Sequence, residues 1–105
     1  MLVSAWKNGK HSQSGVGYGV RLGDLDRDRH FQKEWRTVTV ELKGRAQPIV
    51  IRSVGTPSFW NSCGELRSKE IGVWLIENGK APWPTGRPPI LVLNQIEGTR
   101  FSLGF

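Results

Sequence analysis

The sequence contains little cysteine and no long hydrophobic run, and these two absences limit the kind of protein it can be. Its 105 residues include a single cysteine, Cys63, so an internal disulfide and a cysteine-rich zinc site are both excluded. No stretch approaches the roughly 18 apolar residues of a membrane span. The opening stretch MLVSAWKNGK lacks the basic-then-apolar layout of a signal peptide. We therefore expect a cytoplasmic protein that does not associate with membranes.

Negative charge is also scarce. The chain has 15 lysines and arginines against nine acidic residues, which gives a net charge of +6. The basic residues are spread along the chain rather than gathered in a tail. A positively charged domain attracts polyanions through its summed field. Many small proteins are equally basic without binding a polyanion, so the charge leaves both interpretations open.

The sequence has no motif typical of a metal or nucleotide site. Asp24, Asp26 and Asp28 alternate as at the start of a calcium loop, but Arg29 and Trp35 stand where that loop requires glycine and glutamate. The glycine-rich residues 15–19 match neither the dinucleotide-binding pattern nor the P-loop. We therefore expect no metal and no cofactor.

Nucleophilic catalysis would need a nucleophile and a base. Cys63 is the candidate thiol, with His11 or His30 as the base, and the expected helix start at Cys63 would favour its thiolate. Neither histidine lies near Cys63 in the sequence, and a small buried side chain is the expected role of this cysteine. The sequence therefore predicts a protein without catalytic activity.

Alternating hydrophobic residues predict short strands at residues 2–6, 16–22, 35–42, 49–54, 90–93 and 100–103. Ser62 and Glu65 form a capping-box pattern, which predicts the start of a main helix over residues 62–78. The dipeptide Asn78-Gly79 is typical of a helix end. A short helical segment is expected over residues 24–31, with Asp24 as its N-cap.

The predicted elements fit one small domain, because 105 residues support a single core. Within the main helix, Ile71, Trp74 and Leu75 fall on one apolar arc. Four prolines keep residues 81–89 out of helix and central strand. Short turns between strands favour antiparallel pairing. We expect an α+β fold: a small bent antiparallel sheet or half-open β-barrel with one main helix (62–78) and a short helical segment (24–31).

The run Phe59-Trp60-Asn61-Ser62, followed by a helix with Trp74 and the strand ILVL, resembles the B3-type pseudobarrel DNA-binding domains. The likeness is confined to the C-terminal half, and Gly86-Arg87-Pro88-Pro89 stands where that family has a glycine-aspartate turn. The resemblance implies a seven-stranded open barrel that grips the DNA major groove with two arms. By position, those arms would be residues 7–11 and 54–62.

Together these observations make DNA binding the leading hypothesis for function. Basic side chains neutralise phosphates, and asparagine can read adenine edges in a duplex groove. Double-stranded DNA would be clasped by two loops that share one rim of the barrel, and nothing in the sequence argues against a homodimer. The residues expected at this interface are Lys7, Asn8, Lys10, His11, Arg52, Trp60, Asn61, Ser62 and Arg67.

The alternative hypothesis is a protein- or small-ligand-binding domain. It places a groove lined by Trp60 and Trp83 beside the proline-rich crossing. A concave apolar pocket with few charges would favour this alternative. Basic loops that share one face would favour DNA binding.

Overall fold

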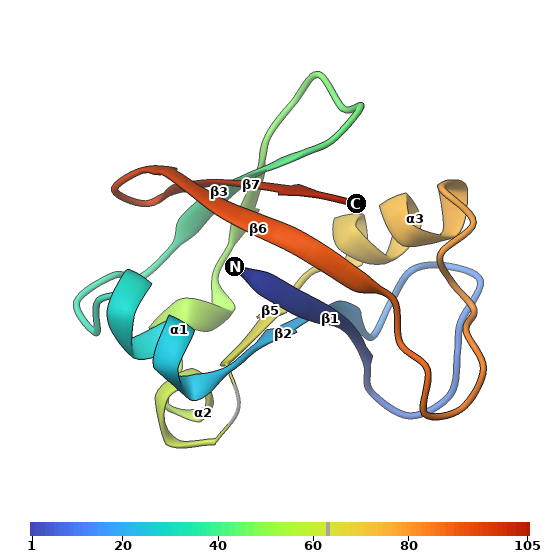
Figure 1. Cartoon of the computed structure of the whole chain (residues 1–105), viewed down its shortest axis with the longest axis horizontal. Helices are drawn as coiled ribbons and strands as arrows, with labels where there is room; N and C mark the ends of the chain where they lie inside the picture. The colour runs from blue at the N-terminus through green and yellow to red at the C-terminus, as the bar shows by residue number, and fades with distance from the viewer. Residues whose placement is uncertain (63) are drawn as a thin grey trace.

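Seven β-strands form one mixed sheet in the computed structural model, which describes residues 1–62 and 64–105 (Figure 1). The strands are β1 (Leu2–Lys7), β2 (Tyr18–Leu22), β3 (Val38–Leu42), β4 (Ile49–Ile51), β5 (Gly64–Arg67), β6 (Ile90–Glu97) and β7 (Arg100–Gly104). Their order across the sheet is β4-β3-β7-β6-β1-β2-β5. The alternating patterns correctly predict all of them except β5, which falls among residues expected to be helical.

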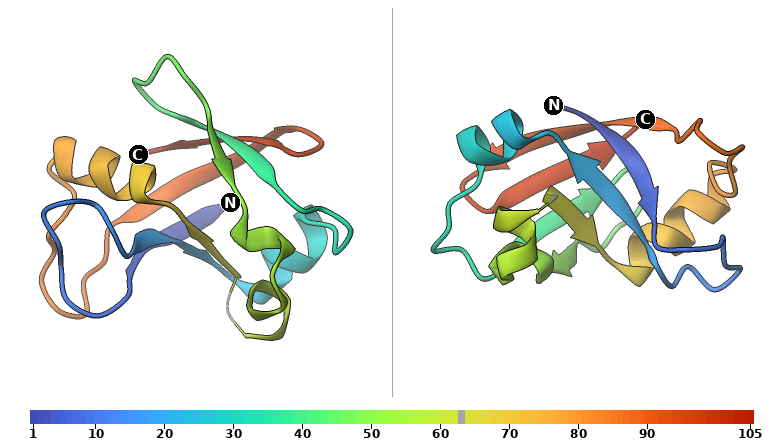
Figure 2. Two further views of the ribbon diagram at one scale, coloured as in Figure 1. Left: turned by 180° about the vertical axis from the view of Figure 1, so that it is seen from behind. Right: turned by 90° about the horizontal axis from the view of Figure 1, so that it is seen from below.

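The sheet curls until its two edges approach each other, so that it nearly closes into a barrel (Figure 2). Neighbouring strands are antiparallel except β3 and β7, which run parallel. At the gap between the edges, a 3₁₀ helix (Ser53–Gly55) takes the place of the predicted end of the fourth strand. The Ser53 hydroxyl donates to the Glu65 carbonyl (2.7 Å) and accepts from the Arg67 N–H (3.2 Å). The expected α+β half-open barrel is confirmed, with a mixed rather than purely antiparallel sheet.

Three short helices accompany the sheet: α1 (Asp24–His30), α2 (Pro57–Asn61) and α3 (Lys69–Glu77). The helix α1 confirms the short helical segment expected at residues 24–31. Its N-cap is Gly23 rather than Asp24, and no side chain caps it. The helix α2 was not predicted, although Pro57 at its first turn suits a helix start because proline has no N–H to leave unpaired.

The main helix is much shorter than the expected span of residues 62–78. It begins after Ser68, whose hydroxyl oxygen accepts the N–H of Glu70 (3.1 Å) and serves as the N-cap. Ser62 therefore does not start this helix, and Glu65 lies in β5. The predicted end at Asn78-Gly79 is confirmed, because Asn78 is the C-cap and Gly79 takes φ +69°. Cys63, expected near the start of this helix as a small buried residue, lies outside the described residues.

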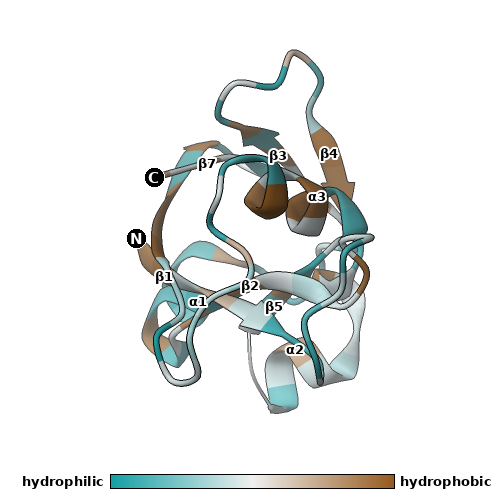
Figure 3. Cartoon of the chain, turned by 90° about the vertical axis from the view of Figure 1, so that its right-hand side faces the viewer, coloured by the Kyte–Doolittle hydropathy of each residue, from teal (hydrophilic) through white to brown (hydrophobic). Residues whose placement is uncertain are grey.

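The core lies inside the curled sheet, with α3 against one end and Phe59 of α2 against the other. Its largest fully buried side chains include Trp74, Tyr18, Phe59 and Phe101. On α3, Trp74 is buried together with Ile71 and Leu75, which confirms the predicted apolar arc. The Trp74 Nε1 donates to the Lys43 carbonyl (2.9 Å), so the one polar atom of this ring is satisfied. Figure 3 shows α3 and β4 coloured mainly as hydrophobic segments.

The helices mark two opposite ends of the barrel (Figures 1 and 2). The strand β2 runs from Tyr18, beside the β1–β2 loop, to Leu22, beside α1. The strand β5 runs the other way, because Gly64 pairs with Leu22 and Arg67 with Gly19. The helix α2 therefore lies near α1, while α3 lies near the β1–β2 loop. We call these the α1–α2 end and the α3 end. Within the part of the chain that the structure describes, no helix has the length and hydrophobicity to cross a membrane.

Candidate nucleic-acid interface

The β1–β2 loop, residues 8–17, carries the first group of predicted DNA-binding residues at the α3 end. Its base is closed by the Asn8 N–H, which donates to the Gly17 carbonyl (2.8 Å). The Lys7 Nζ donates to the Gly9 carbonyl (2.6 Å), and Asn8 and Lys10 are exposed. The end of β1 and the loop together therefore present two ammonium groups and an amide at one end of the molecule.

His11 is predicted to contact DNA, but both nitrogens of its ring contact other groups of the protein. Its Nδ1 lies 2.7 Å from the Tyr18 hydroxyl, and its Nε2 lies 3.2 Å from the Trp83 carbonyl oxygen. Its ring also packs edge-on against the Trp83 ring, with centroids 4.6 Å apart. His11 thus ties the β1–β2 loop to the proline-rich crossing before β6. We assign it this structural contact instead of the predicted DNA contact.

The second group, Arg52 and Arg67, lines a groove where the two edges of the sheet approach each other. Two adjoining hollows of about 630 and 470 Å³ make up this groove and share Val50, Arg52 and Glu70. We call it the seam groove. Its polar lining consists of Arg45, Gln47, Arg52, Ser53, Thr56, Arg67, Ser68 and Glu70.

The arginines of the seam groove differ in how their charge is compensated. Arg45 pairs with Glu77 (2.8 Å). Arg52 and Arg67 are exposed and form no ion pair with any residue in the described ranges 1–62 and 64–105. Guanidinium groups without an internal partner are suited to bind an external oxyanion such as a phosphate. Arg45 and Glu70 were not among the predicted site residues, because nothing in the sequence indicates that β4 and α3 border one groove.

The β1–β2 loop and the seam groove are neighbours around the start of α3. The Ser68 N–H donates to the Tyr18 carbonyl (3.2 Å), which places the end of the loop beside one wall of the groove. The returning limb of the loop rests on α3, where Gly15 lies against the backbone of Lys69 and Val73. The exposed Lys69 therefore lies between the two groups. The predicted residues that the fold brings to this side are Lys7, Asn8, Lys10, His11, Arg52 and Arg67.

The remaining predicted residues, Trp60, Asn61 and Ser62, lie at the α1–α2 end. Trp60 and Asn61 belong to α2, and Ser62 is the residue after it. The ring of Phe59 in α2 packs on the ring of Phe31, which directly follows α1 (5.4 Å between centroids). Figure 1 shows α2 on the opposite side of the molecule from the β1–β2 loop. The two loops expected to clasp DNA from one rim thus lie at opposite ends. The strand β5 follows these residues and leads from the α1–α2 end to α3, so residues 60–62 lie a strand's length away from the α3 end.

Trp60 is half-buried and held by the protein. Its Nε1 donates to the Val54 carbonyl (3.1 Å), and the Arg27 guanidinium lies over its ring, 5.6 Å from the centroid. Arg27 is itself buried, and its Nη1 donates to the Phe59 carbonyl (3.2 Å). Arg27 therefore fixes α2, and with it Trp60, against α1.

Replacing Arg27 by methionine should lower the free energy of unfolding by about 1.5 kcal/mol, because a charged hydrogen bond to a buried carbonyl is lost while the apolar stem is kept. Urea unfolding, followed by tryptophan fluorescence, measures the change. The exposed neighbour Arg29 is the control, and Arg29→Met should alter stability by less than about 0.5 kcal/mol. Equal effects of the two substitutions would contradict the role given to Arg27.

Trp83 lies at the α3 end, and the groove between Trp60 and Trp83 expected in the alternative hypothesis is not formed. The ring of Trp83 packs on His11 and on Tyr18, with centroids 4.6 and 5.7 Å apart. Since β2 runs from Tyr18 toward α1, the length of the barrel separates Trp83 from Trp60. Both tryptophans stabilise loop packing at their own ends.

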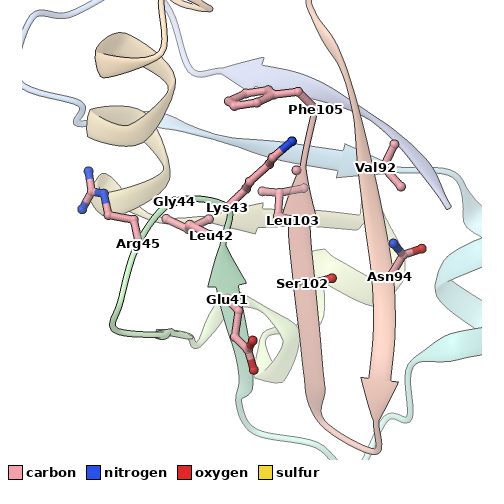
Figure 4. Close-up of a pocket in the computed structure, with 11 residues that line it drawn as sticks. Glu41, Leu42, Lys43, Gly44, Arg45, Val92, Asn94, Ser102, Leu103 and Phe105 are labelled. Atoms are coloured by element: carbon pink, nitrogen blue, oxygen red, sulfur yellow. The ribbon is translucent and has the colours of Figure 1, made fainter.

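A further hollow of about 500 Å³ lies on the outer face of β3, β7 and β6 (Figure 4). Its charges are mixed and partly compensated, since Glu41 pairs with Arg100 (3.3 Å). Figure 4 shows Glu41 and Lys43 pointing away from each other, and Arg45 directed to the far side of β3. The polar groups do not converge on one point, so we do not consider this hollow the candidate site.

The described residues include no group of three or more histidine, cysteine, aspartate or glutamate side chains that could hold a metal ion. Comparison of the chain with known proteins gives no match: it matches no protein-family model, no curated protein and no solved structure.

Proposed function

We propose that this protein is a small DNA-binding module without catalytic activity of its own. The observation that carries the proposal is the seam groove, where Arg52 and Arg67 are exposed and unpaired within the described chain. The net charge of +6 supports it. In this proposal Lys7, Lys10, Arg52 and Arg67 contact phosphates, and Asn8 lies near the bases.

The arrangement differs from the two-loop clasp expected from the sequence. The β1–β2 loop and the seam groove form one binding surface around the start of α3, and residues 60–62 take no part in it. Such a surface would contact the backbone of a duplex along one side. Phosphate contacts position a protein on DNA and supply most of the non-specific affinity.

Fluorescence anisotropy on a mixed-sequence duplex, titrated at several salt concentrations, tests the proposal. We expect the logarithm of the binding constant to fall linearly with the logarithm of salt concentration, by about 0.9 for each phosphate contacted. The double variants Lys7→Ala/Lys10→Ala and Arg52→Ala/Arg67→Ala should each reduce the steepness by about 1.8, because each removes two contacts.

The control is Arg29→Ala/Arg36→Ala, which removes the same charge from two exposed arginines outside the seam groove: Arg29 lies in α1, and the backbone of Arg36 lies against Gly55, just before α2. This control should leave the slope unchanged. If it lowers the slope as much as the other two variants, DNA is attracted only by the general field. Absence of binding at about 50 mM salt would show that the proposed function is wrong.

A further inference from the structure

The seam groove contains a negative charge among its arginines. Glu70 lines both hollows, and the other charged lining residues are Arg45, Arg52 and Arg67. A carboxylate free to move beside guanidinium groups would pair with one of them, because such charge-assisted pairs are among the stronger hydrogen bonds. Among the described residues, Glu70 forms no ion pair with an arginine. Its carboxylate is hydrogen-bonded to Ser68 instead.

Ser68 holds the Glu70 carboxylate. The Ser68 hydroxyl donates to Glu70 Oε2, and the same Ser68 oxygen accepts the Glu70 N–H (3.1 Å). The Ser68 hydroxyl and then the backbone N–H of Glu70 itself lower the pKa of the Glu70 carboxyl. Slight burial opposes this shift, and the charge of Lys69 makes the smallest contribution, which lowers the pKa. Glu70 is therefore ionised at neutral pH, fixed at the start of α3, and separate from Arg52 and Arg67.

We propose that Ser68 keeps the Glu70 carboxylate from neutralising Arg52 and Arg67, so that both guanidinium groups remain available to DNA phosphates. This inference rests on the proposed function of DNA binding and assigns Ser68 as a positioning residue. Glu70 in turn weakens phosphate binding through its nearby negative charge. The pair thus sets the affinity of the groove for DNA.

Four proteins test the inference by anisotropy on one mixed-sequence duplex at low salt: wild type, Ser68→Ala, Glu70→Gln and the double variant. Ser68→Ala should weaken binding about threefold, because the released carboxylate can then reach the arginines. Glu70→Gln should tighten binding about threefold, because one negative charge leaves the groove. The double variant should bind as Glu70→Gln does, since without the charge the serine hydroxyl has nothing to hold.

Two controls separate this role from a purely structural one. Ser68→Thr keeps the hydroxyl and the N-cap and should bind as wild type does. Glu34→Gln makes the same charge change at an exposed glutamate elsewhere and measures the effect of net charge alone. Thermal unfolding of each variant confirms that it is folded at the temperature of the assay.

Each outcome decides the question. If Ser68→Ala weakens binding by the same factor in wild type and in the Glu70→Gln variant, Ser68 acts only as a helix cap and the inference is wrong. If all variants bind alike while Arg52→Ala/Arg67→Ala weakens binding, the proposed function stands and the inference fails. If wild type does not bind, both fail. Should Ser68→Ala not fold, equal changes in Glu70→Gln and Glu34→Gln would still refute the role of Glu70.

Discussion

Replacing Gly72 by alanine should destabilise the protein by roughly 3 kcal/mol, although alanine is normally favoured over glycine inside a helix by about 1 kcal/mol. A Cβ at position 72 would meet the Gly15 carbonyl oxygen at 2.0 Å and the Gly15 Cα at 2.7 Å. The obstructing atoms are backbone, so the clash cannot be relieved by rotating a side chain. Gly15 takes φ +89°, and a Cβ there would meet the Val73 backbone nitrogen at 2.7 Å. The β1–β2 loop can therefore pack on α3 only while both positions lack a side chain.

Thermal or urea unfolding measures this change. For a chain of this size, a loss of 3 kcal/mol lowers the melting temperature by roughly 12 °C or more. Gly104→Ala is the matched control, because a Cβ there would make only ordinary contacts, 3.5–3.7 Å, with the Lys43 side chain. Gly104→Ala should change the free energy of unfolding by less than about 0.5 kcal/mol. An unchanged melting temperature for Gly72→Ala would show that the loop does not pack on α3 as described.

The sequence predicts most of the fold, because hydrophobic alternation reports directly which face of a strand is buried. In β3, Val38, Val40 and Leu42 alternate with polar residues and are all buried. This pattern does not predict the parallel pairing of β3 with β7. The two strands are far apart in the sequence, and alternation is the same in parallel and antiparallel edges.

The largest error in the predicted secondary structure concerns residues 62–68, where a helix-start pattern overlaps with a strand pattern. Ser62 and Glu65 have the spacing of a capping box, yet Leu66 is buried between the outward-facing Glu65 and Arg67, as in a strand. Pairing of β5 with β2 decides in favour of the strand, and this long-range contact is invisible in the local pattern. The true N-cap, Ser68, also precedes a glutamate, but by two residues rather than three. The capping-box pattern therefore predicts a helix correctly but places its start at Ser62 instead of Ser68.

The same error explains why the candidate site was only partly predictable. A helix over residues 62–78 would have kept Trp60 and Ser62 close to the elements at the α3 end. The strand β5 instead moves them to the α1–α2 end, while it brings Arg67 beside Arg52. The sequence shows which residues are basic, but their grouping in space depends on how the barrel closes. No local pattern in the sequence contains that information.

Closure of the barrel depends on Ser53, and Ser53→Ala should lower the free energy of unfolding by roughly 2–3 kcal/mol. Ser53 is buried, and its hydroxyl both donates to the Glu65 carbonyl and accepts the Arg67 N–H. Alanine would leave these two groups of the β5 edge without partners, and each unsatisfied group costs about 1–3 kcal/mol where water cannot replace the bond. Because water can reach part of this edge, we expect a value below the sum of the two.

Hydrogen exchange distinguishes this local cause from a general loss of stability. In Ser53→Ala the Arg67 amide should exchange faster by a larger factor than the amides of β6 and β7, since it alone loses its acceptor. Ser102→Ala removes a half-buried hydroxyl from the outer face of the sheet and should leave both the stability and the Arg67 amide unchanged. If Arg67 remains as protected in Ser53→Ala as in wild type, the Ser53 hydroxyl does not join the two edges. If Arg67 loses its protection and DNA affinity falls with it, the geometry of the seam groove depends on this single side chain.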